Sequence, residues 1–346
     1  MARQRRKSNK TGGLGATGTR LVVLLVLLSA AAAAVWLAVT PFGPDTETFV
    51  EIAPGESSAR IAGQLQAAGI IRSRYAFDLL RWVKRGRLEA GEYRFDHPAP
   101  MTEVYGRIAR GDVYTRTVVV PEGANIFEIG ERLEAAGLGT EDEFLAAQAR
   151  NVDLIQDLDP RATSLEGYLF PDTYRFTRQE TMKQILSRMV EQFRKEAAAL
   201  GLTGNVHNVV TLASLVERET AVNGERPMVA SVFENRLKKK MPLATDPSVI
   251  YGLELKGEWR GTIYASDLKR NTPYNTYLHT GLPPGPIANP GVKALEAAMH
   301  PAETKYLYFV AAGANPQGKS LFAATLAEHA RHVAGYRKAM KKESEQ

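Results

Sequence analysis

One carboxylate in this chain continues an apolar helix face, a position suited to proton transfer. Val209, Leu212, Leu215 and Val216 follow i, i+3, i+6, i+7 spacing, and Glu219 is the next residue on the same face. A carboxyl group on an apolar face is partly removed from water, which disfavours its charged form and raises its pKa. Glu219 is therefore a candidate general acid that donates a proton near neutral pH.

The same residue has a structural interpretation. A glutamate at a helix end can turn to solvent or pair with a basic side chain, and Arg218, Arg226 and Arg236 are all near Glu219 in the sequence. Spacing alone favours this structural interpretation. Glu217 lies about 200° round the helix from Glu219, so the two glutamates are expected to have different surroundings.

A second group of polar and aromatic residues follows later in the chain. Asp246 is a candidate for a second acidic role, in which it orients a substrate hydroxyl or polarises the site, although Asp before Pro also commonly opens a turn. Tyr274, Asn275, Thr276 and Tyr277 offer aromatic faces, amides and hydroxyls that suit contact with a sugar. The structural alternative for these four residues is a polar loop after a proline.

Two further segments are candidates for the walls of a cleft. Asn235 and Arg236 end a predicted helix and would line the cleft, although Arg236 would equally form a surface ion pair. The segment GLPPGPIANPG over 281–291 is rich in Pro and Gly, which restrict or shape the backbone. It predicts a rigid wall rather than a reacting group.

The sequence does not contain the residue patterns that several other kinds of catalysis require. The chain has no cysteine and no G-x-S-x-G motif, which argues against thiol and serine nucleophiles. Among the histidines, only His329 and His332 share a predicted helical face, and they lack the H-E-x-x-H arrangement. We therefore expect neither a metal site nor a cofactor.

The elements that position these residues follow from hydrophobic spacing. Apolar residues at helical spacing predict helices over 182–200, 206–220, 226–240 and 292–299, and YLYFV predicts a strand over 306–310. The chain between the third and fourth of these helices reads as loop-rich. Helices followed by strands and long turns indicate an α+β domain, assigned to residues 161–340, rather than a doubly wound sheet.

An internal repeat precedes this domain. FVEIAPGESSARIAGQLQAAGII from Phe49 aligns with TVVVPEGANIFEIGERLEAAGLG from Thr117. Each copy predicts a strand, a Pro/Gly turn and a helix closed by glycine. Both resemble LysM-like α/β modules, which implies binding of N-acetylated glycans, and the alternative is a duplicated packing unit without a ligand. The copies are assigned to a LysM-like module at 45–115 and a second, repeat-related subdomain at 116–160.

The N-terminal end predicts a membrane anchor. Residues 1–20 hold six basic side chains and no acidic one, which accounts for the net charge of +6 and leaves the rest formally neutral. A basic tail beside an apolar segment is the positive-inside pattern, whereas nucleic-acid binding requires a basic face on the folded part, so we expect no nucleic-acid partner. Residues 21–40 are uncharged and long enough for one transmembrane helix. A cleaved signal peptide with its small residues at Ala30–Ala34 is the alternative.

Long motifs add a resemblance to a known family. The run LASLVERETAVNGERPMVASVFENRLKKKMPLATDPSVIYG is followed in order by TPYNTY, GLPPGPIANPG, HPAETKYLYFV, and later Phe322, Thr325, Glu328 and His329. This series resembles the endolytic murein transglycosylase family, also called YceG-like or MltG. The resemblance implies that Glu219, the second glutamate of the E-x-E-T motif, is the catalytic residue.

The resemblance also implies the reaction and its place. The substrate would be peptidoglycan glycan strands, cleaved without water between N-acetylmuramic acid and N-acetylglucosamine to leave a 1,6-anhydro end. Cleavage of nascent strands would end their elongation, and peptidoglycan synthases are candidate partners. We expect an enzyme with its N-terminus in the cytoplasm, one pass through the inner (cytoplasmic) membrane and a periplasmic or extracytoplasmic catalytic domain.

Two other functions stay open on the sequence. One is a non-catalytic, membrane-anchored scaffold that binds peptidoglycan through the repeat. The other is a hydrolase that uses Glu219 and Asp246 as its two carboxylates and produces reducing ends.

Overall fold

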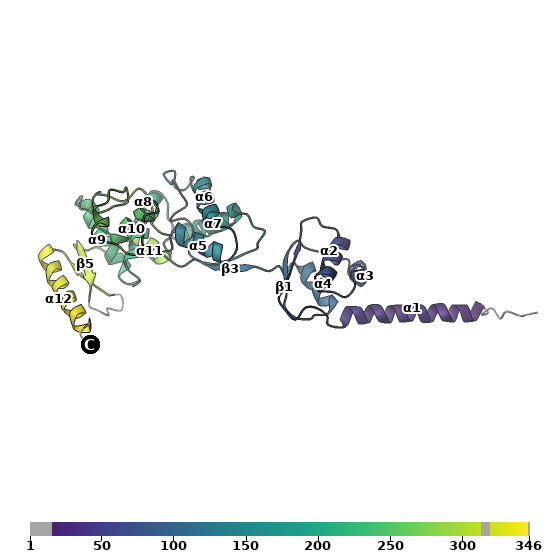
Figure 1. Cartoon of the computed structure of the whole chain (residues 1–346). Helices are drawn as coiled ribbons and strands as arrows, with labels where there is room; N and C mark the ends of the chain where they lie inside the picture. The colour runs from purple at the N-terminus through teal and green to yellow at the C-terminus, as the bar shows by residue number, and fades with distance from the viewer. Residues whose placement is uncertain (1–15, 313–318, 345–346) are drawn as a thin grey trace, which may run out of the picture. The chain divides into compact units, whose positions relative to one another are not determined.

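The computed structural model describes residues 16–312 and 319–344. They form two units that divide between Thr115 and Arg116, each with its own hydrophobic core (Figure 1). Most of the basic tail predicted over residues 1–20 lies outside the described residues.

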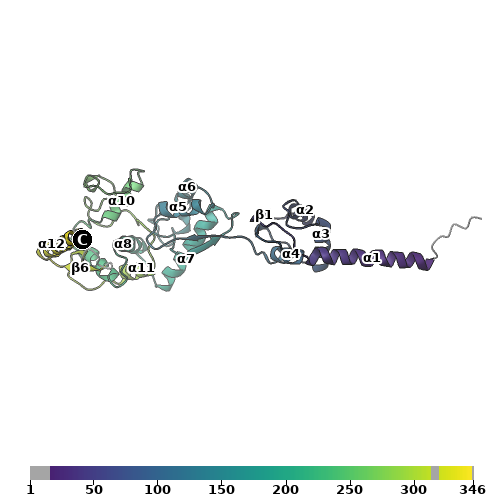
Figure 2. The ribbon, with the colours of Figure 1, turned by 60° about the horizontal axis from the view of Figure 1, so that its bottom comes forward.

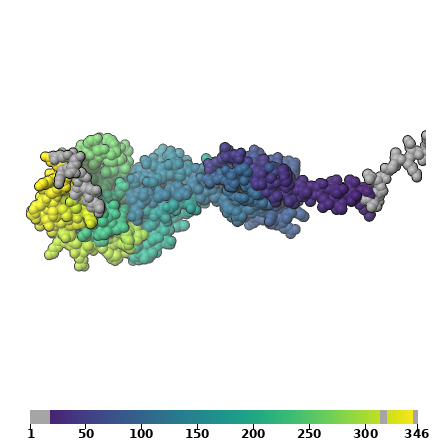
Figure 3. All heavy atoms as spheres, turned by 90° about the horizontal axis from the view of Figure 1, so that it is seen from below, coloured from purple at the N-terminus to yellow at the C-terminus, as the bar shows by residue number. Residues whose placement is uncertain are grey.

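The predicted apolar segment is the helix α1 (Ala16–Val39), which is uninterrupted in Figures 1 and 2. Its stretch Gly18–Val39 has 22 residues and a mean hydropathy of 2.7, and none of it is buried, as Figure 3 also shows. At 1.5 Å per residue it is about 33 Å long, which matches the hydrocarbon thickness of a bilayer. No other helix in the described part of the chain has the length and composition of a membrane span, and α1 fits both an anchor and a signal sequence.

The first unit has a strand, two helices and a strand around one core, followed by a further helix. In chain order these are β1 (Thr48–Ile52), α2 (Ser58–Ala67), α3 (Arg74–Lys84), β2 (Gly91–Phe95) and α4 (Met101–Arg110). β1 and β2 pair antiparallel. The helices bury one face each against this hairpin, and the fully buried side chains include Ile52, Leu65, Phe77, Tyr93 and Ile108.

The second unit begins with the same order of elements. They are β3 (Arg116–Val119), α5 (Ile126–Ala135), α6 (Glu141–Arg150), the short 3₁₀ helix η1 (Val152–Leu154) and β4 (Thr173–Phe176). β3 and β4 also pair antiparallel. The repeat predicted as strand, turn and helix is therefore confirmed, and the structure extends each copy to a strand, two helices and a strand.

Equivalent glycines shape the turns of the two copies. Gly55 and Gly123 follow the first strand of each copy with φ of +77° and +80°. This left-handed conformation is adopted by glycine without the penalty that a Cβ atom brings. The turns then end at equivalent helix caps, Ser57 and Asn125, whose side chains accept a hydrogen bond from the first turn of the helix.

The rest of the second unit is mainly helical. Its elements are α7 (Met182–Ala199), α8 (Val206–Glu219), α9 (Arg226–Lys238), α10 (Asp246–Glu254), η2 (Asp267–Lys269), α11 (Val292–Met299), β5 (Tyr308–Ala311), β6 (Ser320–Ala323) and α12 (Leu326–Ser344). The four helices predicted by spacing are confirmed as α7, α8, α9 and α11, and the predicted strand is β5, which pairs antiparallel with β6. The mixture of helices and strands agrees with the predicted α+β class.

One helix of this unit was missed by the sequence analysis. Residues 246–254 form α10 inside the segment that was expected to be loop-rich. Asp246 opens this helix, and Thr245 caps it by accepting a hydrogen bond from the N–H of Ser248. Pro247 fits the first turn because the N–H that proline lacks has no partner there in any helix. The Asp-Pro pair therefore marks a helix start and not an isolated turn.

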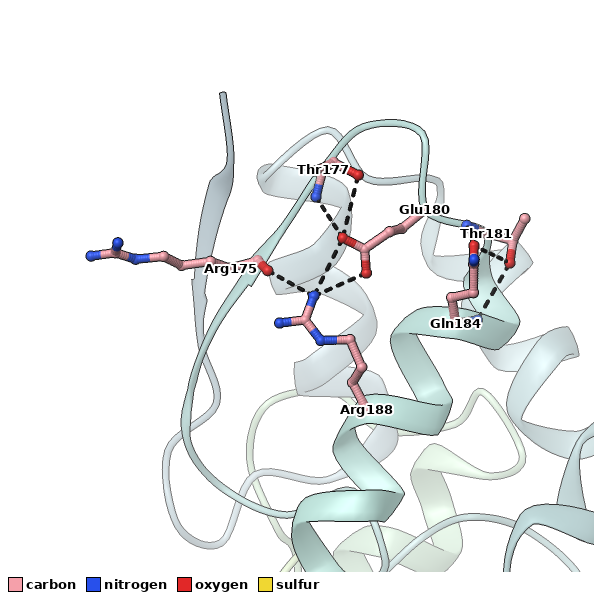
Figure 4. Close-up of polar contacts among 6 residues, drawn as sticks. All are labelled: Arg175, Thr177, Glu180, Thr181, Gln184 and Arg188. Atoms are coloured by element: carbon pink, nitrogen blue, oxygen red, sulfur yellow. Dashed lines mark hydrogen bonds and ion pairs between the residues drawn. The ribbon is translucent and has the colours of Figure 1, made fainter. Parts of the chain in front are cut away.

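The start of α7 shows how polar residues fix the beginning of a helix (Figure 4). Thr181 and Gln184 form a capping box, in which each side chain accepts from the other's backbone N–H. Just before it, Glu180 accepts from the backbone of Thr177 at 2.8 Å and pairs with Arg188 at 3.0 Å. These contacts place α7 at the end of β4.

The helix α8 runs through the centre of this core. It packs against α9, α10 and α11, and Figure 2 shows these elements gathered with α12 at one end of the unit. Leu212, Leu215 and Val216 of α8 are buried there, as the apolar spacing predicted. The last residue of α8 is Glu219.

Candidate active site

Glu219 is held at the end of α8 by a sharp change in the backbone. Thr220 leaves the helix in an extended conformation, and its hydroxyl accepts a hydrogen bond from the N–H of Val222 at 3.1 Å. The helix therefore ends at Glu219, which is partly buried at the edge of the hydrophobic core. Its carboxyl group lines a pocket with a volume of about 270 Å³.

The pocket brings together residues that are far apart in the chain. The helices α8, α9, α10 and α12, the strand β5 and two loops contribute side chains to it. The lining residues are Glu219, Phe233, Arg236, Leu243, Ala244, Asp246, Pro247, Tyr277, Phe309 and His329. The lining is thus apolar and aromatic on several sides, with two carboxylates and one guanidinium among the polar groups.

The pocket changes the acidity of Glu219. Burial and, after it, the negative charge of Asp246 raise the pKa of Glu219 to about 7. A hydrogen bond from Thr245 and the positive charge of Arg236 act in the opposite direction. The raised pKa that the helical spacing predicted is therefore present, and near neutral pH the group both donates and accepts a proton.

Asp246 has a defined position beside Glu219 in this pocket. It occupies the first turn of α10. The hydroxyl of Tyr277 donates a hydrogen bond to it at 2.7 Å. The pocket therefore holds two carboxyl groups, Glu219 with a raised pKa and Asp246 with a hydrogen bond from Tyr277.

The four residues of the predicted substrate loop have different positions. Tyr277 lines the pocket, whereas the other three point into the protein. The amide of Asn275 donates to two backbone carbonyls of its own loop, and the hydroxyl of Thr276 accepts from the N–H of Thr245 at 3.0 Å. The ring of Tyr274 packs edge-on against Tyr251 with centroids 5.0 Å apart. These three residues therefore fix the loop that carries Tyr277.

Asn235 and Arg236 are neighbours in α9 with different surroundings. The amide of Asn235 donates to the carbonyls of Thr304 and Tyr306, and its side chain does not line the Glu219 pocket. Arg236 lines that pocket and donates to the carbonyl of Leu307 at 2.7 Å. Its guanidinium is held by backbone carbonyls, so the alternative of a surface ion pair does not describe it.

Glu217 is buried on the other side of α8, as its angular position predicted. It pairs with Arg226, and its second carboxylate oxygen accepts from the N–H of Gly291 at 3.0 Å. Gly291 ends the Pro/Gly segment over 281–291, none of whose residues lines the Glu219 pocket. The segment therefore packs behind α8, and the prediction that it forms a wall of the cleft is wrong for this pocket.

Six pocket residues were not identified from the sequence as site residues: Phe233, Leu243, Ala244, Pro247, Phe309 and His329. Phe233, Phe309 and His329 belong to α9, β5 and α12, and no local motif links them. The His329 ring stacks on Tyr308 with centroids 5.1 Å apart, and burial lowers its pKa, which favours the neutral ring. In the sequence His329 belongs to the series that carries the family resemblance and shares a helical face with His332, but neither pattern indicates a pocket position, and the described residues contain no cluster suited to a metal ion.

Comparison with known proteins gives a consistent result. The profile of the YceG-like family matches residues 50–335. An endolytic murein transglycosylase of Bacillus subtilis (strain 168) is 35% identical over 317 residues, which cover 84% of this chain and 85% of the relative. An endolytic murein transglycosylase of Streptococcus pneumoniae (strain D39) is 27% identical over 318 residues, and the match spans 57% of that longer protein.

A solved structure has the same fold over most of the chain. The crystal structure of a yceG-like protein from Listeria monocytogenes is 31% identical and superposes with a TM-score of 0.53. The match covers 83% of this chain and 99% of the Listeria chain.

Proposed function

The chain belongs to the YceG-like family, and we propose that it is an endolytic murein transglycosylase in which Glu219 is the catalytic acid and base. The observation that carries the assignment of Glu219 is its place in the pocket. It is a partly buried carboxyl group with a pKa raised to about 7, at the end of the central helix. The activity itself follows from the relatives, which are named for it.

The proposed reaction needs one residue for both proton transfers. Neutral Glu219 donates its proton to the glycosidic oxygen between N-acetylmuramic acid and N-acetylglucosamine, and that bond breaks. The resulting carboxylate then removes the proton from the 6-hydroxyl of the muramyl residue, whose oxygen bonds to C1. The products are an N-acetylglucosamine hydroxyl and a 1,6-anhydro end, and Glu219 recovers its proton.

Asp246 and Tyr277 are the pocket residues best placed to act with Glu219. The negative charge of Asp246 stabilises the protonated form of Glu219 and faces the positive charge that develops at C1. Tyr277 presents an aromatic ring to the strand while its hydroxyl holds Asp246. Tyr274, Asn275 and Thr276 contribute indirectly, because they shape the loop.

The N-terminal part gives the enzyme its location. We propose that α1 is an uncleaved anchor in the cytoplasmic membrane, with the N-terminus inside and both units outside. The first unit then acts as a LysM-like module that binds the glycan strand. In this position the enzyme acts on strands as synthases release them, and its cleavage ends their growth.

The test uses purified, uncrosslinked glycan strands and identifies the new chain ends by mass spectrometry. We expect anhydro ends from the wild type and a loss of about 10²- to 10⁴-fold in rate for Glu219→Gln. Glu234→Gln is the matched control, because Glu234 lies on the neighbouring helix α9 and outside the pocket. It should cleave like the wild type.

Three results would contradict the proposal. Full activity of Glu219→Gln would remove the residue from the mechanism. Reducing ends would show a hydrolase that uses Glu219 with Asp246. Binding of strands without cleavage by the wild type would favour the non-catalytic scaffold.

A further inference from the structure

The helix α3 of the first unit has two apolar faces, and one of them is uncovered within its unit. Phe77 is fully buried in the core of the unit. On the opposite face, about 175° away, Tyr75, Leu79, Trp82 and Val83 form a stripe with exposed fractions of 70%, 49%, 70% and 62%. We call these four residues the α3 stripe. Exposed apolar groups that gather on one helix face, including a Trp and a Tyr, indicate a binding surface.

Basic side chains accompany the α3 stripe. Arg74, Arg81, Lys84, Arg85 and Arg87 are all exposed, in a stretch whose acidic residue is Asp78. Arg74 borders the stripe, because its guanidinium lies 4.8 Å from the ring centre of Tyr75, and Arg85 and Arg87 follow the end of the helix, whereas Arg81 and Lys84 lie on the other side of α3. An exposed apolar stripe with Trp and Tyr and with Arg beside it is the pattern of a helix that lies in the interface of a bilayer with anionic lipids.

The position of α3 relative to α1 identifies which surface it would meet. α1 packs against α3 and α4, and the partly covered residues of α1 are near its C-terminal end, at Ala34, Leu37 and Ala38. Figures 1 and 2 both show α3 beside this end of α1. If α1 crosses the bilayer, this end lies at the membrane surface, and α3 lies at the same depth.

Arg72, just before α3, ties the two helices together at this level. Its guanidinium lies over the rings of Trp36 and Phe42, 4.7 Å and 4.9 Å from their centres. It also donates a hydrogen bond to the carbonyl of Pro41 at 3.3 Å. Trp36 is in the last turn of the apolar stretch, where tryptophan favours the lipid headgroup region. The contact therefore holds the start of α3 at the expected headgroup level.

We propose that α3 is a second membrane contact, in which the α3 stripe enters the outer surface of the membrane crossed by α1 and the basic residues bind anionic phospholipid headgroups. This inference rests on the anchor proposed for α1. Its consequence is that the first unit is fixed to the membrane surface at two places, so α1 does not act as a free tether.

The experiment uses the full chain reconstituted in vesicles of phosphatidylglycerol and phosphatidylethanolamine. Because the chain has no cysteine, a single introduced cysteine carries an environment-sensitive fluorophore. Val83→Cys reports on the α3 stripe, exposed Ala59→Cys on α2 is the matched control in the same unit, and Leu28→Cys in α1 reports on the anchor. Lipids with a spin label near the headgroup or deep in the acyl chain quench a fluorophore at their own depth.

We expect the Val83 label to lose most of its emission to the shallow quencher, the Leu28 label to the deep quencher, and the Ala59 label to neither. Replacing phosphatidylglycerol with phosphatidylcholine should weaken the quenching at Val83 and leave Leu28 unchanged. Strand cleavage by each labelled chain shows that it is folded, and it tests the proposed activity separately.

Each alternative result has a definite meaning. A quenched Leu28 label with a Val83 label no more quenched than Ala59 overturns the second contact and leaves the anchor intact. A Val83 label with blue-shifted emission but no lipid quenching overturns it in favour of protein covering the stripe. An unquenched Leu28 label overturns the anchor and, with it, this inference. Quenching at Val83 that is independent of phosphatidylglycerol overturns the role of anionic headgroups.

Discussion

The two copies of the repeat have the same local structure and differ in what covers the turn between strand and helix. In the first copy the turn borders an open pocket of about 510 Å³. The residues that line it are Glu51, Ala53, Pro54, Gly55, Glu56, Arg60 and Gln64. Two of its polar side chains bond to each other within the copy, because the amide nitrogen of Gln64 donates to Glu56 at 2.9 Å.

In the second copy the equivalent turn is covered by later parts of its own unit. The N–H of Gly123 donates to the carbonyl of Asn289 at 2.9 Å, and its carbonyl accepts from Arg218 at 3.0 Å. Asn289 returns a side-chain hydrogen bond to the carbonyl of Ala124 at 2.9 Å. Arg218 is the residue before Glu219, so this turn supports the end of α8.

The difference shows that one local structure serves two purposes. The strand, the glycine turn and the capped helix are set by short-range rules that both copies obey. Whether the turn remains open or becomes a support depends on partners that are distant in the sequence. The turn of the first copy stays open, while that of the second has become part of the core that holds Glu219.

The largest expected effect comes from equivalent core leucines, and it tests whether the copies belong to separate units. Leu65 and Leu133 are both fully buried. Truncation of either to Ala should cost about 2–5 kcal/mol in its own unit. We expect Leu133→Ala to lower the temperature of inactivation of strand cleavage by about 5–15 °C, and Leu65→Ala to leave it unchanged. Equal shifts for the two variants would show that the units unfold together.

The next effect removes the cover from the second turn. Asn289 is fully buried and bonds to Ala124, to Glu166 and to the N–H of Leu169. Asn289→Ala leaves these groups without a partner and should cost about 2–3 kcal/mol. Chemical denaturation monitored by far-UV circular dichroism measures this loss.

The matched change in the first copy should have little effect. Gln64→Ala alters the wall of the open pocket and should stay within about 0.5 kcal/mol. A loss as large as that of Asn289→Ala would mean that the first turn is also a support.

A smaller effect tests whether the backbone conformation that the two turns have in common determines the cost of replacing their glycines. Gly55→Ala and Gly123→Ala each place a Cβ atom at positive φ, which should cost about 1–2 kcal/mol. The Cβ at Gly55 would meet open space and that at Gly123 would lie 3.4 Å from the Cγ of Glu217, an ordinary contact. Similar losses in the transitions of the two units are therefore expected, and a much larger loss for Gly123→Ala would show that its surroundings determine the cost.

The smallest expected effect concerns the pocket itself, and it is a shift in the pH dependence of cleavage. In the proposed mechanism cleavage begins with protonated Glu219, so its rate should fall as pH rises through the pKa of about 7. Asp246→Asn removes a negative charge that raises this pKa, so the alkaline limb of the rate profile should move to lower pH. Tyr277→Phe keeps that charge and is the control, with a smaller shift. An unmoved limb in Asp246→Asn would show that Asp246 does not act on Glu219.

The sequence was a good guide wherever a feature depends on neighbours within a few turns of helix. Apolar spacing predicted α7, α8, α9 and α11, and it placed Glu219 and Glu217 on different sides of α8. It failed for α10, where Asp246 and Pro247 resemble the start of a turn and of a helix equally well. A local pattern that suits two structures is decided only by the packing of the residues that follow it.

The composition of the pocket was less predictable for the same reason. Among the residues proposed to contact substrate, Asp246 and Tyr277 line the pocket with Glu219, while Asn275 bonds within its loop and Thr276 bonds to Thr245 at the start of α10. His329 reaches the pocket from α12, and nothing in its own segment indicates this. Within one short motif, the path of the backbone decides which polar or aromatic side chain faces the pocket and which one packs into the protein.

The sequence by itself determined the apolar N-terminal segment, the repeat, the central helix and the carboxylate at its end, because each is a pattern of residues close in the chain. Only the tertiary structure decided which of the two turns supports α8 and which charges surround Glu219. The support depends on hydrogen bonds of Gly123 with Asn289 and Arg218, and the charges depend on Asp246 and Arg236, which come from two other helices. The direction of the pKa shift of Glu219 is thus predictable from its helix face. The neighbouring groups that contribute to the shift are known only from the fold.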